Sequence, residues 1–216
     1  MDLKIDSEDL EDMLLKIEDS FDIRFEPNEL AHVKTYGEFH DAIKDKISLD
    51  HSEDCTTQQA FYKLREALIK STDINRKEIT PTTTLTEIFP KKSRKNQIKI
   101  LEMNLGFKLS ILRPPYFVTG FLAILLLASF VMLFIHWQYG LGLAIGGLWI
   151  SDKLGNELDC KTVRDLSNKM AREHYLKSRR NSKTMNKNEF DKILEDCFID
   201  FLGVRKSELT REARLF

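Results

Sequence analysis

The segment "INRKEITPTTTL" at residues 74–85 decides how the chain is organised, because a similar segment, "VRKSELTREARL", stands near its end at residues 204–215. The two align without a gap. Glu, Thr and the final Leu are identical, and apolar residues occupy the first and sixth positions of both. Each segment follows an amphipathic helical pattern. A segment that recurs in the same setting indicates an internal repeat.

Two shorter pairs extend the repeat. "FDIRF" at 21–25 is similar to "LGFKL" at 105–109, and each follows a helical pattern. "TYGEF" at 35–39 is similar to "TVRDL" at 162–166, and each opens one. Three kinds of element therefore occur twice, in a different order along the chain.

Apolar residues recur at helical spacing in five charged segments, which predicts amphipathic helices. The predicted helices cover residues 7–20, 35–47, 56–70, 93–105 and 188–202. Because no strand pattern of comparable strength occurs, we expect an all-α protein.

Residues 116–150 form a run of 35 residues without a charge. One membrane-spanning helix needs about 20 apolar residues, so the run is long for one span and barely enough for two. We predict a transmembrane hairpin with arms at 116–135 and 139–150. Glycines in the second arm would allow close packing on the first arm. The shortness of this arm leaves a re-entrant path open, and a buried soluble hairpin is the alternative.

Basic segments flank the apolar run on both sides, at 91–95 ("KKSRK") and 177–183 ("KSRRNSK"). Positive charge on both sides favours two cytoplasmic flanks. The acidic amino terminus lacks the pattern of a signal peptide. We therefore expect an integral protein of the cytoplasmic (inner) membrane, with both termini cytoplasmic and membrane lipid as a partner.

The net charge of −1 conceals a strong asymmetry. Residues 1–54 carry 17 acidic and 6 basic side chains, a net of −11, and the remainder carries a net of +10. An acidic surface suits a basic protein partner, and a basic surface beside an apolar segment suits anionic lipid headgroups.

Few features of the sequence indicate an enzyme. It contains no glycine-rich phosphate loop, no nucleophile with a base at useful spacing and no cluster of metal ligands. Cys55, Cys160 and Cys197 are far apart, and we expect them to be buried, reduced thiols of a cytosolic protein. The basic run after residue 176 is interpreted as a linker beside the membrane rather than a nucleic-acid site. We expect no catalysis, no metal and no nucleic acid.

The repeated elements resemble, in permuted order, those of the acyl carrier protein family. Residues 188–216 are similar to the family's first helix and long loop, and residues 2–48 to the rest. Reading "ARLF" (213–216) into "MDLKIDS" (1–7) nearly restores a carrier sequence. The resemblance implies acyl-carrier-like helical bundles with an inserted transmembrane helical hairpin. Closure within one chain and swapping between two chains of a homodimer both satisfy the pattern.

The resemblance divides the chain into four parts. A permuted carrier-like unit, here named the outer copy, comprises 1–50 plus 188–216. A degenerate second unit, the inner copy, comprises 55–112 plus 158–175. The transmembrane hairpin covers 114–150, and a basic linker covers 176–187.

The resemblance also implies a site at Asp6-Ser7. In carrier proteins the serine of this motif bears 4′-phosphopantetheine, whose thiol holds an acyl group as a thioester. Acidic side chains on the following helix dock basic partner enzymes, such as acyl transferases or synthases. Here those side chains would be Glu8, Asp9, Glu11, Asp12, Glu18 and Asp19.

Two residues depart from the family pattern. Lys4 stands where the family has glycine, and Glu8 stands where an apolar residue follows the serine. Ser7 could instead be only a helix N-cap, since acids in the first turn suit the helix dipole. The protein would then be a non-catalytic membrane adaptor that recruits a partner through its acidic helix.

Overall fold

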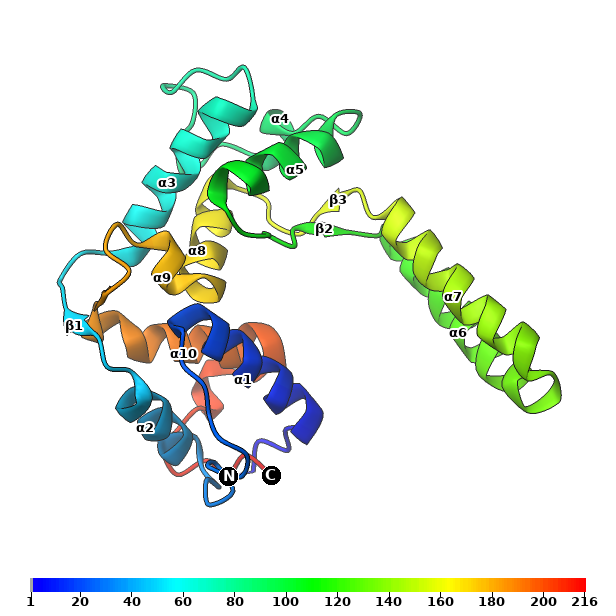
Figure 1. Cartoon of the computed structure of the whole chain (residues 1–216), viewed down its shortest axis with the longest axis horizontal. Helices are drawn as coiled ribbons and strands as arrows, with labels where there is room; N and C mark the ends of the chain where they lie inside the picture. Colours follow the sequence, from blue (N-terminus) through cyan, green and yellow to red (C-terminus); the bar gives the residue numbers. More distant parts are fainter. Residues whose placement is uncertain (1) are drawn as a thin grey trace. The chain divides into compact units, whose positions relative to one another are not determined.

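The computed structural model describes residues 2–216, except for the side chains of residues 148 and 150–153. Within this range it contains ten α-helices, one 3-10 helix and four strands of two residues each (Figure 1). The expected all-α class is confirmed. The chain divides into two compact units, one comprising residues up to 64 together with 164–216, and the other residues 65–163.

The first unit contains α1 (Ser7–Phe21), α2 (Tyr36–Lys46) and α10 (Lys187–Leu202), with the shorter α9 (Tyr175–Ser178) and η1 (Lys206–Glu208). The helix α3 (Thr56–Ser71) begins in this unit, and most of α8 (Val163–Glu173) belongs to it. Strands β1 (Asp50–His51) and β4 (Thr184–Met185) pair in parallel.

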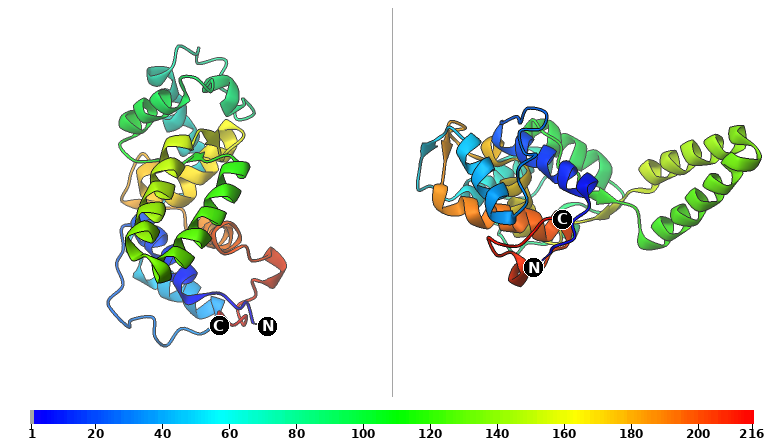
Figure 2. Two further views of the ribbon diagram at one scale, coloured as in Figure 1. Left: turned by 90° about the vertical axis from the view of Figure 1, so that its right-hand side faces the viewer. Right: turned by 90° about the horizontal axis from the view of Figure 1, so that it is seen from below.

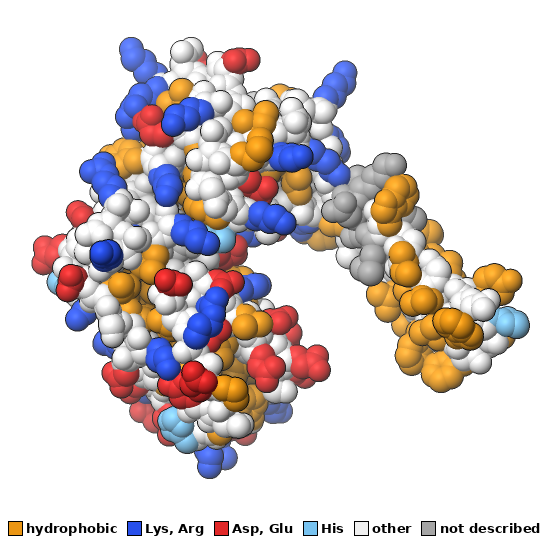
Figure 3. All heavy atoms as spheres, viewed as in Figure 1, with side chains coloured by type: hydrophobic (Ala, Val, Ile, Leu, Met, Phe, Trp, Pro, Cys, Tyr) orange, Lys and Arg blue, Asp and Glu red, His pale blue; other side chains and the backbone are white. Residues whose placement is uncertain are grey.

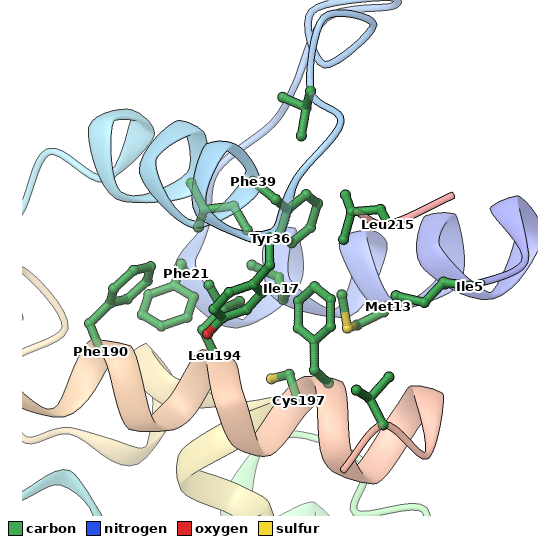
Figure 4. Close-up of a cluster of buried hydrophobic side chains, with 14 of the residues drawn as sticks. Ile5, Met13, Ile17, Phe21, Tyr36, Phe39, Phe190, Leu194, Cys197 and Leu215 are labelled. Atoms are coloured by element: carbon green, nitrogen blue, oxygen red, sulfur yellow. The ribbon is translucent and has the colours of Figure 1, made fainter. Parts of the chain in front are cut away.

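Apolar faces of α1, α2 and α10 form the core of the first unit (Figure 4). The ring of Phe198 on α10 meets Tyr36 and Phe39 of α2 edge to face, with ring centres 5.0 and 5.6 Å apart. Phe21 at the end of α1 stacks on Tyr175 at 4.8 Å. Burial of these aromatic side chains is the main stabilising contribution to such a unit.

The two ends of the chain meet in this unit (Figures 1 and 2). The N–H of Leu3 donates to the carbonyl of Arg214 at 2.8 Å, and that of Ile5 to the carbonyl of Leu215 at 2.9 Å. Ile5 and Leu215 are both buried. In this structure the permuted ends therefore join within one chain.

The second unit contains α4 (Leu85–Ile88), α5 (Arg94–Leu105) and a hairpin of α6 (Tyr116–Ile135) and α7 (Trp137–Leu154). Strands β2 (Leu112–Arg113) and β3 (Glu157–Leu158) pair antiparallel just outside the hairpin. Here these four residues are named the neck. Figure 2 shows α6 and α7 side by side.

Equivalent positions of the two copies make the same backbone contacts. In the outer copy, Leu215 donates its N–H to the carbonyl of Lys34 at 2.9 Å. In the inner copy the aligned Leu85 donates to the aligned Lys161, also at 2.9 Å. The helices that follow these two accepting lysines, α2 and α8, have 11 residues each. The repeat read from the sequence thus extends to main-chain hydrogen bonding.

Helices α3 and α10 bury the same positions. Aligning the two repeats places four buried residues of one helix on four buried residues of the other. These are Ala60, Leu64, Ala67 and Leu68 in α3, and Phe190, Leu194, Cys197 and Phe198 in α10.

The segment 176–187, predicted to be a basic linker, is packed into the first unit. It contains most of α9 and all of β4, and its Arg179 side chain is buried. Nη1 of Arg179 donates to Thr56 Oγ1 at 2.5 Å and to the carbonyl of Asp54 at 3.1 Å. These hydrogen bonds with distant residues hold a segment whose composition resembles that of a linker.

Candidate functional site

Ser7 is the first residue of α1 and is exposed. The helix is capped by Asp6, whose Oδ1 accepts the N–H of Glu8 at 2.9 Å. The alternative that Ser7 is the N-cap is therefore wrong, because the carboxylate one residue earlier occupies that position. The Ser7 hydroxyl is left at the start of the helix, facing solvent.

Ser7 is among the residues that line a mostly apolar cavity of about 470 Å³. It lies between α1, the loop that follows α1 and the C-terminal segment. Ser7 and Glu11 belong to its lining on the α1 side, while Leu10, Leu14 and Phe39 give it an apolar wall. The structure therefore places an exposed hydroxyl beside a space that could receive an apolar group.

Four of the six predicted docking carboxylates, Glu8, Asp9, Glu11 and Asp12, are exposed on α1. Asp19 is also exposed, but its Oδ1 lies 2.7 Å from Nη2 of Arg24. In Figure 3, acidic side chains gather over part of the first unit. The acidic surface near Ser7 is formed by the first two turns of α1.

Glu18 was wrongly assigned to this surface. Its side chain is buried, and Oε1 accepts the N–H of Phe25 at 2.7 Å. The aligned Glu102 of the inner copy accepts the N–H of Leu109 at the same distance. Both carboxylates tie a loop back to the helix that precedes it. The sequence repeat could have indicated this role, since a glutamate stands seven residues before the last residue of both "FDIRF" (21–25) and "LGFKL" (105–109).

Lys4 has a left-handed backbone conformation with φ of 52°. Glycine adopts this conformation more readily than other residues do, and the acyl carrier family that the sequence resembles has glycine at this position. The backbone turn before Asp6-Ser7 is thus formed despite the lysine.

The inner copy has a different arrangement at the place equivalent to Ser7, which Lys91 occupies. Lys91 Nζ lies 2.6 Å from Glu157 Oε1, and this hydrogen bond holds the pKa of Glu157 below its usual range. Arg94 is buried, and its Nη1 donates to the carbonyl of Asn156 at 2.5 Å. The start of α5 is therefore bound to the neck and its adjoining residues.

His40 on α2 is a buried polar residue that the sequence did not single out. Its Nε2 lies 2.8 Å from Asp191 Oδ1 on α10, and its Nδ1 lies 3.0 Å from Asp41 Oδ1. The hydrogen bond with His40, followed by one from Arg211, lowers the pKa of Asp41. His40 and Asp191 are 151 residues apart in the chain, so periodicity could not pair them. The group links two core helices.

The helix α6 is long and apolar enough to cross a membrane, and within the described residues it is the one helix that meets this test. The second arm, predicted at 139–150, extends over 137–154 as α7. Aromatic side chains mark both ends of the hairpin: Tyr116 and Trp149 at the neck end, Trp137 and Tyr139 at the other, each more than 60% exposed. Figure 3 shows the mostly hydrophobic surface of the hairpin.

Two of the four glycines predicted to pack on the first arm do so. A Cβ at Gly140 would lie 2.7 Å from the backbone nitrogen of Leu133, and one at Gly147 would lie 3.0 Å from Leu125. Ser129 Oγ also donates to the carbonyl of Gly140 at 2.7 Å. Gly142 and Gly146 have open space where a Cβ would be.

The structure also shows where the possible metal ligands and the three cysteines lie. Across residues 2–216, as far as the structure describes them, no three His, Cys, Asp or Glu side chains are gathered as metal ligands would be. All three cysteines are free, and Cys160 and Cys197 are buried as expected. Cys55 is exposed, contrary to expectation, because it precedes α3 in a loop.

No family model, curated protein or solved structure matches the chain. Function is therefore inferred from the residues and geometry of the Ser7 region and the hairpin.

Proposed function

We propose that this protein is a membrane-anchored, acyl-carrier-like protein that presents a phosphopantetheine-tethered acyl group at the cytoplasmic face of a membrane. The observation that carries the proposal is the position of Ser7. Ser7 is exposed at the start of α1, does not cap the helix because Asp6 does, and belongs to the lining of an apolar cavity.

The residues around Ser7 fit 4′-phosphopantetheine. The exposed hydroxyl can form a phosphodiester, and the cavity wall of Leu10, Leu14 and Phe39 can receive an apolar chain. When bound, the group supplies a thiol that carries an acyl chain as a thioester. Lys4 adopts the positive φ that the family's glycine would favour, so the lysine does not prevent this backbone conformation. Glu8 is the other departure from the pattern.

The exposed acids Glu8, Asp9, Glu11 and Asp12 give this chain its proposed role in partner choice. A patch of one charge attracts an oppositely charged surface and raises the rate of encounter. Basic enzymes such as acyl transferases or synthases would dock here. Binding should weaken with added salt because the charges are exposed.

Membrane anchoring by the hairpin is the second part of the proposal. A 20-residue helix such as α6 is about 30 Å long, which matches the hydrocarbon thickness of a bilayer. Tyrosine and tryptophan at both ends of the hairpin are typical of the two membrane interfaces. In the proposal α7 spans the membrane as well. Two spans would keep both termini on the cytoplasmic side.

Intact mass spectrometry tests the carrier function. The full-length protein is purified in detergent after co-expression with a broad-specificity phosphopantetheinyl transferase. We expect a mass gain of one phosphopantetheine group, lost in Ser7→Ala. Glu8→Leu, which restores the family's apolar residue, should raise the modified fraction.

An absence of mass gain in both the parent and Glu8→Leu, with folded protein and a transferase that modifies a known carrier, would contradict the carrier function. The protein would then be an adaptor that recruits a partner through the acidic surface of α1. Alkaline carbonate extraction tests the membrane part separately, and we expect the protein to stay in the membrane pellet.

A further inference from the structure

We propose that the acyl group carried on Ser7 ends in an ammonium, so that the substrate class of this carrier is an aminoacyl group. The apolar part of the group would lie in the cavity that Ser7 helps to line, and its ammonium would face two carboxylates of the same lining. The inference rests on the proposed carrier function and names the substrate class of that site.

The cavity combines apolar walls with negative charge. Most residues that line it are apolar, but three are glutamates: Glu11 and Glu18 of α1, and Glu26 of the loop that follows α1. Among the described residues of this lining, none is basic. A cavity of about 470 Å³ can receive a short acyl chain. Its charge would attract a cationic end of that chain and repel an anionic one.

Two of the three glutamates are free to contact a guest. Glu18 is buried, its Oε1 accepts the N–H of Phe25 at 2.7 Å, and its Oε2 lies 3.9 Å from Nη1 of Arg24. Glu11 and Glu26 are exposed, and neither carboxylate forms a hydrogen bond or an ion pair with any residue that the structure describes. Because exposed carboxylates are charged at neutral pH, these two give the lining an unpaired negative charge.

Basic side chains close to the cavity in sequence do not line it. Six such residues adjoin lining residues along the chain and are absent from the lining itself: Lys16, Arg24, His32, Lys34, His40 and Arg214. Lys16 lies over the ring of Phe201 at 3.9 Å, and Nη2 of Arg24 lies 2.7 Å from Asp19 Oδ1. A cationic guest would therefore meet carboxylates without a competing cation in the lining.

Glu26 separates this inference from the docking of partner enzymes. The proposed docking surface lies on the first two turns of α1, whereas Glu26 belongs to the loop between α1 and α2. Docking on α1 gives no reason for a carboxylate on this loop, but a guest with a positive end does. In water, each exposed carboxylate a few ångströms from an ammonium favours its binding by about threefold.

Amide-linked analogues on Ser7 measure the preference in the full-length protein, reconstituted in lipid nanodiscs. The donors are coenzyme A analogues that carry ε-aminocaproyl, heptanoyl or adipoyl groups, which have similar lengths and end in an ammonium, a methyl group or a carboxylate. The transferase joins the phosphorus to Ser7 Oγ and releases adenosine bisphosphate, and the hydroxyl proton passes to solvent. Intact mass verifies loading of every variant. Hydrogen exchange of the loop 22–33, which supplies part of the lining, reports occupation of the cavity.

We expect this loop to exchange slowest with the ammonium-ended group, at an intermediate rate with heptanoyl and fastest with adipoyl. The difference between the two charged groups should be about threefold or more, and added salt should reduce it. Glu11→Gln/Glu26→Gln, which removes both charges and keeps the side-chain shape, should abolish the ranking. Glu53→Gln/Glu212→Gln removes the same charge from exposed positions of the first unit outside the lining, and should preserve it.

The outcomes separate failure of the inference from failure of the carrier function. If Ser7 is loaded and the three groups give equal exchange, or heptanoyl gives the slowest, the aminoacyl preference is refuted and the carrier function stands. A ranking that persists in Glu11→Gln/Glu26→Gln, or disappears equally in the control variant, would also overturn the inference. If the transferase loads neither the parent nor Glu8→Leu, the carrier function and the substrate class are refuted together.

Discussion

Helices α1 and α5 stand at equivalent places in the two copies and present opposite charges. Ser7 and Glu8 of α1 align with Lys91 and Lys92, which lie in the turn before α5, and Glu11 aligns with Lys95 of α5. All six residues are exposed; two of the three positions are acidic in the outer copy, whereas all three are basic in the inner copy. Yet three residues before its last residue each helix carries a glutamate, and this glutamate accepts the backbone N–H seven residues later at 2.7 Å.

The comparison separates two kinds of constraint. A loop N–H that loses its partner costs free energy, so residues that satisfy it have few substitutes. Exposed side chains can change charge with little effect on stability. One backbone arrangement can therefore present an acidic surface with an exposed serine in one copy and a basic segment bound to the neck in the other.

The largest expected effect concerns the join between the chain ends. Leu215→Ala should lower the free energy of unfolding of the first unit by about 2–5 kcal/mol, because Leu215 is fully buried. It should also loosen the hydrogen bond from Ile5, which no covalent link maintains. Leu85→Ala is the matched change in the inner copy.

Hydrogen exchange and urea unfolding distinguish the two variants. In the Leu215 variant, the N–H of Ile5 should exchange faster than the loss of global stability explains. In the Leu85 variant, the exchange of the Phe89 N–H should rise only as much as the loss of global stability explains, because the turn Leu85–Phe89 is covalently continuous. Equal local loosening at Ile5 and Phe89 would show that the break in the chain has no consequence.

A smaller effect is expected at the paired glutamates. Glu18→Ala should cost about 1–3 kcal/mol, because it leaves the N–H of Phe25 without its carboxylate acceptor. Glu102→Ala should cost less, since Glu102 is only partly buried. Gln at either position keeps an oxygen acceptor and should recover part of the loss. Urea unfolding provides the values, and a neutral Glu18→Ala would contradict the proposed role.

Alkaline pH should affect the outer copy more than the inner one. Burial raises the pKa of Tyr36 to about 12 from 10.0, and burial raises that of Cys197 to about 12 from 9.0. Above these ordinary values the unfolded chain releases protons that the folded chain keeps. Stability should therefore fall as pH rises from 9 to 12, by at most about 1.4 kcal/mol per pH unit for each group.

The aligned inner-copy residues are Val163 and Ala67, which do not ionise. Tyr36→Phe combined with Cys197→Ala should therefore flatten the alkaline limb of a thermal-midpoint profile, whatever its effect at neutral pH. A limb of unchanged slope would indicate that other groups cause the alkaline loss.

The smallest effect is expected at Lys4. A left-handed backbone conformation costs a non-glycine residue about 1–2 kcal/mol. Replacement by glycine removes this cost, but the greater entropy of glycine in the unfolded chain offsets part of the stabilisation. Lys4→Gly should therefore stabilise the protein by about 0.5 kcal/mol. Lys34→Gly, at an exposed lysine without positive φ, should destabilise it slightly. Thermal unfolding of both variants checks the sign.

Much of the helical structure was determined by local sequence. The five predicted amphipathic helices match α1, α2, α3, α5 and α10 to within one residue at each end. Their apolar periodicity depends only on residues three and four apart, which every helix brings together. The repeat was equally readable, because "INRKEITPTTTL" and "VRKSELTREARL" align without a gap.

The tertiary structure decided the roles of single polar residues. Asp6 rather than Ser7 caps α1, and Glu18 turns inward to Phe25 instead of joining the acidic surface. The segment after residue 176 is packed because Arg179 finds acceptors at Asp54 and Thr56. Each outcome depends on which backbone group needs a partner at that place in space. Such partners arise from chain segments far apart in sequence or from local backbone geometry, and composition and periodicity describe neither.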